Sequence, residues 1–475
     1  MTILSAERRM SHGSRSPELI EAERIDPART GVRRADGFDM ALICLFLLGL
    51  YSNYTIQIST NVPFPSAPSG VAGLILLWRR RNQISAIALG GLVGVLLLFL
   101  ISILCATNIN YLSRRTNGLI QLSYSIVIGY ALFLTVTQAS RQQIARLFLG
   151  FAIVILIGCL LENYAGLRPI SDAVRKVIYA RGVYENDLRD MLYYQRVRPK
   201  FFASEPASVT FCYSVFTFVW LVVSRWRWKL VLYVILVGLG MFAMPGPTLL
   251  LMLLLTLPYM LFLASRKAGK LDAARLLLVA LAAVFFLGAF VVLGQSLFPT
   301  RLEEVTSGND PSFFYRVRGP ALVGIDILDS YPIAGAGITG EPFIENRVVN
   351  LYVRSPAYSA SWQVVKPATE LLINYFWLHW IYFGLVWGVI LATAVTAWLV
   401  VIGVPSPAFC WMVWAILGQA SGAYVGPTCW AVLFLAGAAA VLHERPEPQS
   451  ERRGVVEISV LRGVAGPRLS RPNAM

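Results

Sequence analysis

Repeated apolar runs constrain this chain more than any other feature. Runs of roughly 17–23 residues with few charges recur along it, and a helix needs about 20 apolar residues to cross a bilayer. The runs do not alternate between apolar and polar residues, as the strands of a membrane barrel would. The composition agrees, because 56% of the 475 residues are hydrophobic and 14% are charged, against about 25% charged in an average soluble protein. We therefore expect an all-α, polytopic transmembrane helical bundle.

The apolar runs predict a membrane domain, residues 38–442, of about twelve spans. A polar tail, residues 1–37, precedes it, and a basic tail, residues 443–475, follows it. One long run, Leu230–Leu263, is divided at Met244–Pro247, because two prolines and a glycine break a helix. The other predicted spans are Phe38–Ile58, Val62–Trp78, Ile84–Ala106, Gly118–Thr137, Leu147–Leu161, Ala207–Val223, Leu276–Phe298, Ile373–Val401, Ala408–Ala420 and Tyr424–Leu442.

The positive charge predicts which side of the membrane each loop occupies. The formal net charge is +15, and Lys and Arg gather in cytoplasmic loops of membrane proteins, so no nucleic-acid partner is needed to explain it. With both termini in the cytoplasm the basic clusters fall inside, and Arg114–Arg115 is the exception. Two long polar loops, about 164–206 and about 299–369, then share the external face. Each is expected to contain short helices, and together they can build one pocket.

The first long loop brings basic side chains close to the membrane. Arg196, Arg198 and Lys200 precede the predicted span from Ala207, and arginine offers a planar fork of donors that suits phosphate oxygens. We interpret them as an anion site, whereas the charges from Arg168 to Arg189 are typical of a solvated amphipathic helix. Glu205 could orient a sugar or act as a base, or it could be a carboxylate that stabilises a helix N-terminus. The residue alone leaves both interpretations open.

The second long loop combines arginines with a glycine-rich turn. Arg316 and Arg318 precede a predicted short helix, and the turn beyond it holds Gly335 and Gly337, which permit positive φ. No strand precedes the turn, so a dinucleotide fold is not indicated. All six cysteines lie in apolar runs, and no metal or P-loop motif occurs, so we expect no metal, cofactor or disulfide. His379 lies in an aromatic stripe of the kind found at membrane interfaces.

Three stretches of the chain resemble the O-antigen ligase/polymerase superfamily of bacterial envelope proteins. The resemblance covers about residues 195–400 and departs at Ile373, where ligase-type members carry histidine, which favours a polymerase. Its first stretch is RPKFFASEPAS, in which Ala207 separates the Glu-Pro pair from Ser208. The stretches are Arg198–Ser208, Arg316–Gly340 with Pro332, Gly335 and Gly337 in a Pro-x-x-Gly-x-Gly pattern, and Asn374–Gly384.

The resemblance implies a metal-independent glycosyltransferase of the bacterial inner membrane. It would polymerise undecaprenyl-diphosphate-linked oligosaccharide repeat units into exopolysaccharide or O-antigen at the periplasmic face, without a cofactor. The implied partners are the lipid-linked donor and acceptor and the membrane lipid, with a chain-length regulator and a flippase to be considered, and no nucleic acid. The implied roles are catalysis by Glu205 and Arg316, diphosphate binding by Arg196, Arg198, Arg316 and Arg318, and substrate binding by Asn374, Gly335 and Gly337.

Three other functions stay open at this point. The chain could be an O-antigen ligase that transfers glycan to another acceptor. It could also be a transporter or flippase for a lipid-linked oligosaccharide, although transporters place ionisable groups within their spans and these spans hold almost none. A glycosyltransferase with an acidic residue in its first external loop is disfavoured, because Ser59–Ser69 contains no carboxylate.

Overall fold

In the computed structural model of the chain, the described residues are 34–445 apart from 60–61, 107, 180–183, 186, 195, 267–279, most of 282–312 and 356–365. The chain divides into two units, Met1–Arg34 and Ala35–Met475, and every described helix and strand belongs to the second. The described part is all-α apart from one short hairpin. The predicted span Leu276–Phe298 lies mostly outside the described residues.

Among the described residues, six helices are long and apolar enough to cross a membrane. The prediction of a helical membrane protein agrees with this finding, and four further apolar helices are shorter. The six are α3 (Ala86–Leu104), α4 (Leu112–Gln138), α5 (Arg141–Tyr164), α8 (Pro206–Val223), α18 (Tyr375–Val401) and α20 (Pro427–Glu444). The shorter helices are α1 (Gly37–Ser52), α9 (Lys229–Ala243), α10 (Leu250–Arg266) and α19 (Pro407–Gly418).

The predicted division of Leu230–Leu263 is present in the structure. Helix α9 ends at Ala243, the 3₁₀ turn η4 spans Pro247–Leu249, and α10 follows. Proline and glycine in Met244–Pro247 account for this break, because proline has no N–H to donate and its ring clashes with the preceding turn.

The predicted end of the first span and the predicted start of the second span are both wrong. We expected continuous spans over Phe38–Ile58 and Val62–Trp78, but α1 ends at Ser52 and α2 covers Ala67–Arg80. Between them, β1 (Ile56–Ser59) pairs with β2 (Val62–Phe64) in an antiparallel hairpin. The β-branched residues alternating with polar ones in Ile56–Ser59 are a strand signal that the apolar count concealed.

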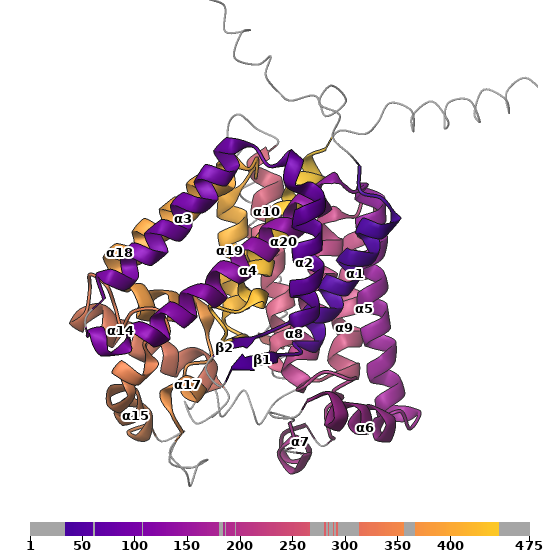
Figure 1. Cartoon of the computed structure of the whole chain (residues 1–475). Helices are drawn as coiled ribbons and strands as arrows, with labels where there is room; N and C mark the ends of the chain where they lie inside the picture. Colours follow the sequence, from indigo (N-terminus) through magenta and orange to yellow (C-terminus); the bar gives the residue numbers. More distant parts are fainter. Residues whose placement is uncertain are drawn as a thin grey trace, which may run out of the picture. The chain divides into compact units, whose positions relative to one another are not determined.

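Helix α1 begins and α20 ends at the same end of the bundle, which we call the terminal end (Figure 1). A cluster of ion pairs, centred on the buried Asp39 and Arg80, lies at the start of α1. Asp36 caps α1 in a capping box with Asp39. Arg79 binds both carboxylates, at 2.8 and 2.7 Å, and Arg80 binds Asp39 at 2.5 Å and also Gln138 of α4. Charges predicted to mark a solvated cytoplasmic loop therefore join α1, α2 and α4.

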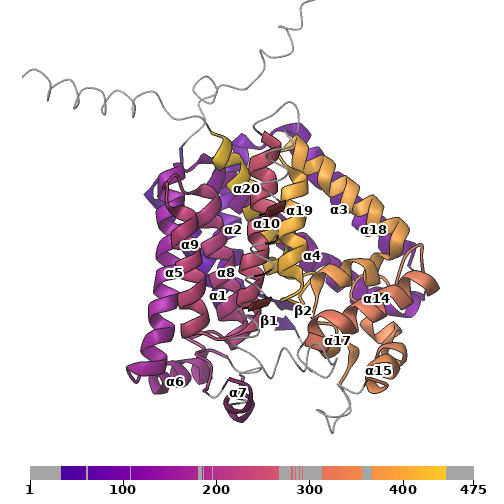
Figure 2. The same cartoon turned by 180° about the vertical axis from the view of Figure 1, so that it is seen from behind.

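The helices of both long loops lie at the opposite end, which we call the loop end (Figures 1 and 2). The shared end agrees with the predicted pairing of the loops. Their helices are α6 (Arg168–Ile178), α7 (Asp187–Tyr194), α14 (Gly319–Ser330), α15 (Glu345–Val353) and α17 (Ala368–Leu371).

Helix α18 is interrupted, and the second loop fills the interruption. Gly384 has φ 65° and ψ −169° inside the helix, a conformation that only glycine adopts readily. The amides of Ala336 and Gly337 donate to the carbonyls of Ile381 and Tyr382, both at 2.8 Å. The amide of Leu385 donates in return to the carbonyl of Pro332 at 2.8 Å. The backbone groups freed by the break are thus satisfied by protein, as a membrane helix requires.

Candidate functional site

The segment that leads into α8 has a strained backbone held by side chains. Phe201 and Phe202 have φ of 34° and 63°, which non-glycine residues seldom adopt. Such strain persists where the surroundings fix the conformation, often at functional sites. The Glu162 carboxylate accepts hydrogen bonds from the amides of Lys200 and Phe201, and the Ser171 hydroxyl accepts one from the amide of Phe202. Tyr51 and Tyr179 donate to the carbonyls of Phe201 and Phe202, and Arg175 donates to the carbonyls of Ala203 and Ser204.

Glu205 follows this segment and is presented to solvent. Its backbone is extended, with φ −149° and ψ 156°, and its exposed side chain does not cap α8. Pro206 occupies the first turn of the helix, where its missing N–H costs nothing. Glu205 thus makes no capping hydrogen bond, and its exposed carboxylate at the start of α8 fits both predicted roles, a helix-dipole carboxylate and a base.

The connection between α9 and α10 lies beside the start of α8. A Cβ atom added to Gly246 would lie 3.7 Å from Cγ2 of Thr210, in the second turn of α8. The buried Thr248 follows in η4, and its hydroxyl accepts a hydrogen bond from Nη1 of Arg316 at 3.5 Å. Arg316 thus approaches from the second loop toward the helix that Glu205 introduces.

Arg196 of the first loop contacts the same connection. Its guanidinium lies 5.7 Å from the ring centroid of Phe242, at the end of α9, and donates to the Tyr164 hydroxyl at 3.3 Å. The Tyr164 and Phe242 rings stack at 5.9 Å. Phe242 and Thr248 are six residues apart, so the predicted arginines Arg196 and Arg316 both lie along one short segment.

Arg198 is engaged in an ion pair inside the first loop. Its Nε donates to the fully buried Asp190 at 2.8 Å, and Nη2 donates to the Tyr184 hydroxyl at 3.2 Å. Burial raises the pKa of the Tyr184 phenol, which keeps it protonated and able to donate to Asp190. Lys200 pairs similarly with Asp187 at 2.9 Å. Arg198 and Lys200 therefore stabilise the loop, and among the described residues the hydrogen-bond and ring partners of Arg198 are Asp190, Tyr184 and Tyr194 of this same loop.

Arg316 lies in a π-helical turn, Phe314–Arg318, at the start of α14. Single π turns are frequent at functional sites. The side chain of Asn374, which is fully buried, donates to the Arg316 carbonyl at 2.7 Å, and Arg318 is exposed. Asn374, predicted to bind substrate, thus contacts the backbone of Arg316 and caps α18 through a hydrogen bond from the Trp377 amide at 3.1 Å.

The predicted substrate-binding glycines are buried packing positions. Gly335 and Gly337 have φ of 57° and 80°. A Cβ at Gly335 would lie 2.5 Å from the Ile381 carbonyl oxygen, and one at Gly337 would lie 2.5 Å from Nε of Arg115. The positive φ of both glycines was predicted correctly. The group that approaches Gly335 closely is the backbone of the broken helix α18, and the group that approaches Gly337 is an arginine of α4.

Arg114 and Arg115, the exception to the predicted charge pattern, hold the second loop in place. Arg115 is buried and donates to the Ala336 carbonyl at 2.9 Å, while Arg114 donates to the Thr339 carbonyl at 3.0 Å. Arg114 also pairs with the buried Glu341 at 3.6 Å. Sequence reasoning missed Glu341, and the misplaced charge of Arg114–Arg115 was the signal that could have indicated a loop partner.

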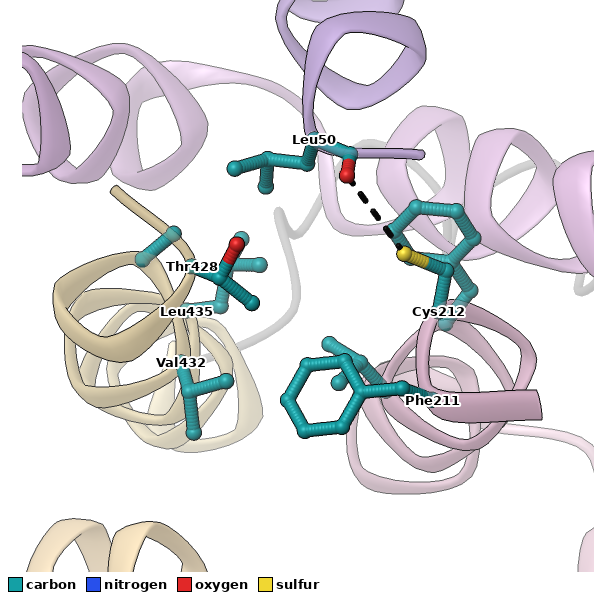
Figure 3. A pocket seen from close by; sticks show the side chains of 9 residues that line it. Leu50, Phe211, Cys212, Thr428, Val432 and Leu435 are labelled. Atoms are coloured by element: carbon teal, nitrogen blue, oxygen red, sulfur yellow. Dashed lines mark hydrogen bonds between the residues drawn. The ribbon is translucent and has the colours of Figure 1, made fainter. Parts of the chain in front are cut away.

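A small crevice between α1, α8 and α20 has a different character (Figure 3). No charged residue lines it, and its polar side chains are Cys212, whose thiol donates to the Leu50 carbonyl at 3.8 Å, and Thr428. His379 is likewise inside the bundle, bonded to the Tyr424 hydroxyl and the Gly388 carbonyl, both at 3.0 Å. Neither feature offers an anion site. Among the described residues, no group of His, Cys, Asp and Glu side chains could hold a metal ion.

These observations describe an all-α protein with six described helices long and apolar enough to span a membrane, in which the helices of the two long loops lie at the same end of the bundle. No protein-family model and no curated protein matches the chain.

Proposed function

We propose that the chain is a membrane glycosyltransferase that polymerises lipid-diphosphate-linked oligosaccharides. The observation that carries the proposal is that Arg196 contacts Phe242 in the last turn of α9, while Arg316, from the other loop, contacts Thr248 in the connection that follows, beside the start of α8. The resemblance to O-antigen polymerases supports the same substrate class. On this proposal the protein lies in a bacterial inner membrane, with both termini cytoplasmic and the loop end periplasmic.

In the proposed reaction an acceptor hydroxyl attacks the anomeric carbon of the donor glycan. The new glycosidic C–O bond forms as the bond between that carbon and the diphosphate oxygen breaks. The proton of the hydroxyl passes to Glu205, and the lipid diphosphate leaves with the electron pair of the broken bond. Because negative charge grows on the leaving oxygen, a preorganised guanidinium stabilises the transition state more than the ground state.

We assign the diphosphate to Arg316, Arg196 and Arg318. Arg316 is positioned by Asn374 through its carbonyl, and Arg318 is exposed two residues further along the same turn. Arg198 can join them only in competition with Asp190, which is buried and already bound to it. Binding of substrate by Asn374, Gly335 and Gly337 is replaced in this proposal by positioning of Arg316 and of the second loop.

A transporter is the alternative that the broken helix α18 suggests, because transporters coordinate ions at such breaks. Here the groups freed at Gly384 are bonded to Pro332, Ala336 and Gly337, which leaves them less able to coordinate an ion. A ligase differs from a polymerase in its acceptor, and the same loops could serve either reaction.

The test uses the full-length chain in lipid nanodiscs with undecaprenyl-diphosphate-linked oligosaccharide, followed by mass spectrometry of the products. We expect a ladder of multiples of the repeat unit, and a loss of at least 100-fold in rate for Arg316→Ala, on the order of one transition-state hydrogen-bond donor. Arg347→Ala is the matched control, because Arg347 lies in the same loop and pairs with Asp326 at 3.2 Å. An Arg316→Ala variant with the wild-type ladder would refute the site assignment. Movement of intact donor across a sealed vesicle membrane, without a ladder, would indicate transport.

A further inference from the structure

Helix α6 is amphipathic in the reverse sense of a helix on a water-soluble protein. Its inward face is polar, because Ser171 and Arg175 are buried. Both side chains have partners inside: the Ser171 hydroxyl accepts from the Phe202 amide at 3.0 Å, and Arg175 donates to the Ala203 carbonyl at 2.7 Å. The polar side chains on the inward face of α6 therefore form hydrogen bonds within the protein.

The outward face of α6 is apolar. Ile170 is 59% exposed and Val177 is 85% exposed, with Ala173 exposed between them. Spacings of three and four residues place the three on one side of a helix. Lys176, next to Val177, is exposed as well. Aliphatic side chains on a helix outside the bundle, with a lysine at their edge, are the pattern of a helix that lies in a membrane interface.

Exposed apolar residues also line α5, the candidate membrane span that precedes α6 in the chain. In α5, exposed residues recur at Val154, Ile157, Leu161 and Tyr164, again spaced by three or four. Helix α6 starts four residues after α5 ends, beyond a bend at Gly166 with φ 73°. Figures 1 and 2 both show α6 at the lower end of α5. Tyr164, 61% exposed at this junction, is a residue type enriched where acyl chains meet headgroups.

We propose that α6 is an interfacial anchor, with Ile170, Ala173 and Val177 in the lipid of the leaflet at the loop end and Lys176 among the phosphates. Lipid rather than a protein partner is the occupant that we infer, because α6 directly follows α5, which is long and apolar enough to span the membrane and carries exposed apolar residues up to its last turn. The anchor also has a consequence for the candidate site. Arg175 binds the carbonyls of Ala203 and Ser204, so a helix held at a fixed depth also fixes the segment that presents Glu205.

The experiment measures the depth of nitroxide labels on the full-length chain in nanodiscs of phosphatidylethanolamine and phosphatidylglycerol. Labels are placed at Ile170→Cys and Val177→Cys, on a Cys105→Ser background because Cys105 is an exposed native cysteine. Glu185→Cys, an exposed polar position of the same loop, is the control. We expect the first two labels to be relaxed by oxygen rather than by a water-soluble nickel chelate, at about 5–10 Å below the headgroups, and the control label to show the opposite preference.

Two results would overturn the anchor. One is a Val177 label as accessible to the nickel chelate as the label at Glu185. The other is dipolar broadening of the Val177 spectrum that disappears on dilution with unlabelled chain, which would assign the face to a second copy. As a second measurement, Val177→Asp should raise amide hydrogen exchange across residues 168–178 several-fold in nanodiscs. Unchanged exchange in that variant would count against lipid burial.

Discussion

The side-chain amide of Asn374 donates a hydrogen bond of 2.7 Å to the main-chain carbonyl of Arg316. The same nitrogen donates to Gln419 at 2.8 Å, and the amide oxygen caps α18. One buried side chain thus connects the start of a candidate membrane span to the arginine that we place at the diphosphate. The distance in sequence between the two residues is 58 positions, so only the fold relates them.

We expect Asn374→Asp to separate the two roles of Asn374, which are to bind the Arg316 carbonyl and to cap α18. An aspartate keeps the cap, whereas the loss of the amide donor leaves the Arg316 carbonyl without this partner, at a cost of about 1–3 kcal/mol. The temperature of thermal unfolding in detergent should fall accordingly. The rate of glycan transfer should also fall, through a lower kcat rather than a higher KM. Asn374→Ala should lose the cap as well, which by itself is worth about 1 kcal/mol. Wild-type kcat in a stable Asn374→Asp chain would contradict the positioning role.

Arg198→Ala should destabilise the chain more than an exposed arginine would. Asp190 is fully buried, and removal of one partner from a buried ion pair costs about 3–5 kcal/mol because the other charge is left uncompensated. Arg198→Ala with Asp190→Asn should recover much of this loss in thermal unfolding. If the recovered double variant also regains transfer activity, Arg198 has only a structural role. If it stays inactive although stable, Arg198 also binds the substrate.

Gly384→Ala should weaken the packing of the second loop against α18. A Cβ there would lie 2.7 Å from the Tyr331 carbonyl oxygen, in addition to a strained backbone worth about 1–3 kcal/mol. Gly403→Ala is the matched control, because Gly403 has φ 84° but open space around its Cα. Limited proteolysis should cut within residues 319–355 faster in Gly384→Ala than in Gly403→Ala. Equal rates would show that the close approach is relieved elsewhere.

Stability should decline at high pH because of Tyr179. Burial raises the pKa of its phenol to about 12, and the hydroxyl donates to the carbonyls of Ser52 and Phe202. A folded-state pKa above the unfolded value of about 10 means that this contribution is present below pH 10 and is lost as the pH rises toward 12. Tyr179→Phe should therefore lose less stability between pH 10 and pH 12 than the wild-type chain does, by on the order of 1 kcal/mol. An equal loss in the two chains would assign the alkaline loss to other tyrosines.

The sequence was most informative where one residue type imposes one geometry. The prolines and glycine of Met244–Pro247 predicted the break between α9 and α10, and Gly335 and Gly337 predicted positive φ. The break at Gly384 was not predicted, because a single glycine in an apolar run also occurs in straight helices. Its cause lies in the distant Pro332–Gly337 turn, which hydrogen bonds to it.

Charges were the least predictable part of the site. Arg80 and Arg198 belong to runs that suggested solvent or ligand, yet each binds a fully buried aspartate, Asp39 and Asp190 respectively. Nothing local distinguishes an arginine with such a partner from one without, because the pair forms only when distant helices pack. The role of Arg316 stays a prediction, although its position in a π-helical turn and its hydrogen bond to Thr248 place it at the α9–α10 connection.

The reciprocal hydrogen bonds between the Pro332–Gly337 turn and the interrupted α18 also limit how this protein can be engineered. A loop transplanted from another protein would leave the carbonyls of Ile381 and Tyr382 without the amides of Ala336 and Gly337 unless it carried the same turn in the same register. Chimeras that exchange this loop should therefore exchange residues 313–401 as one unit, with the junctions placed before the π-helical turn and after the last residue of α18.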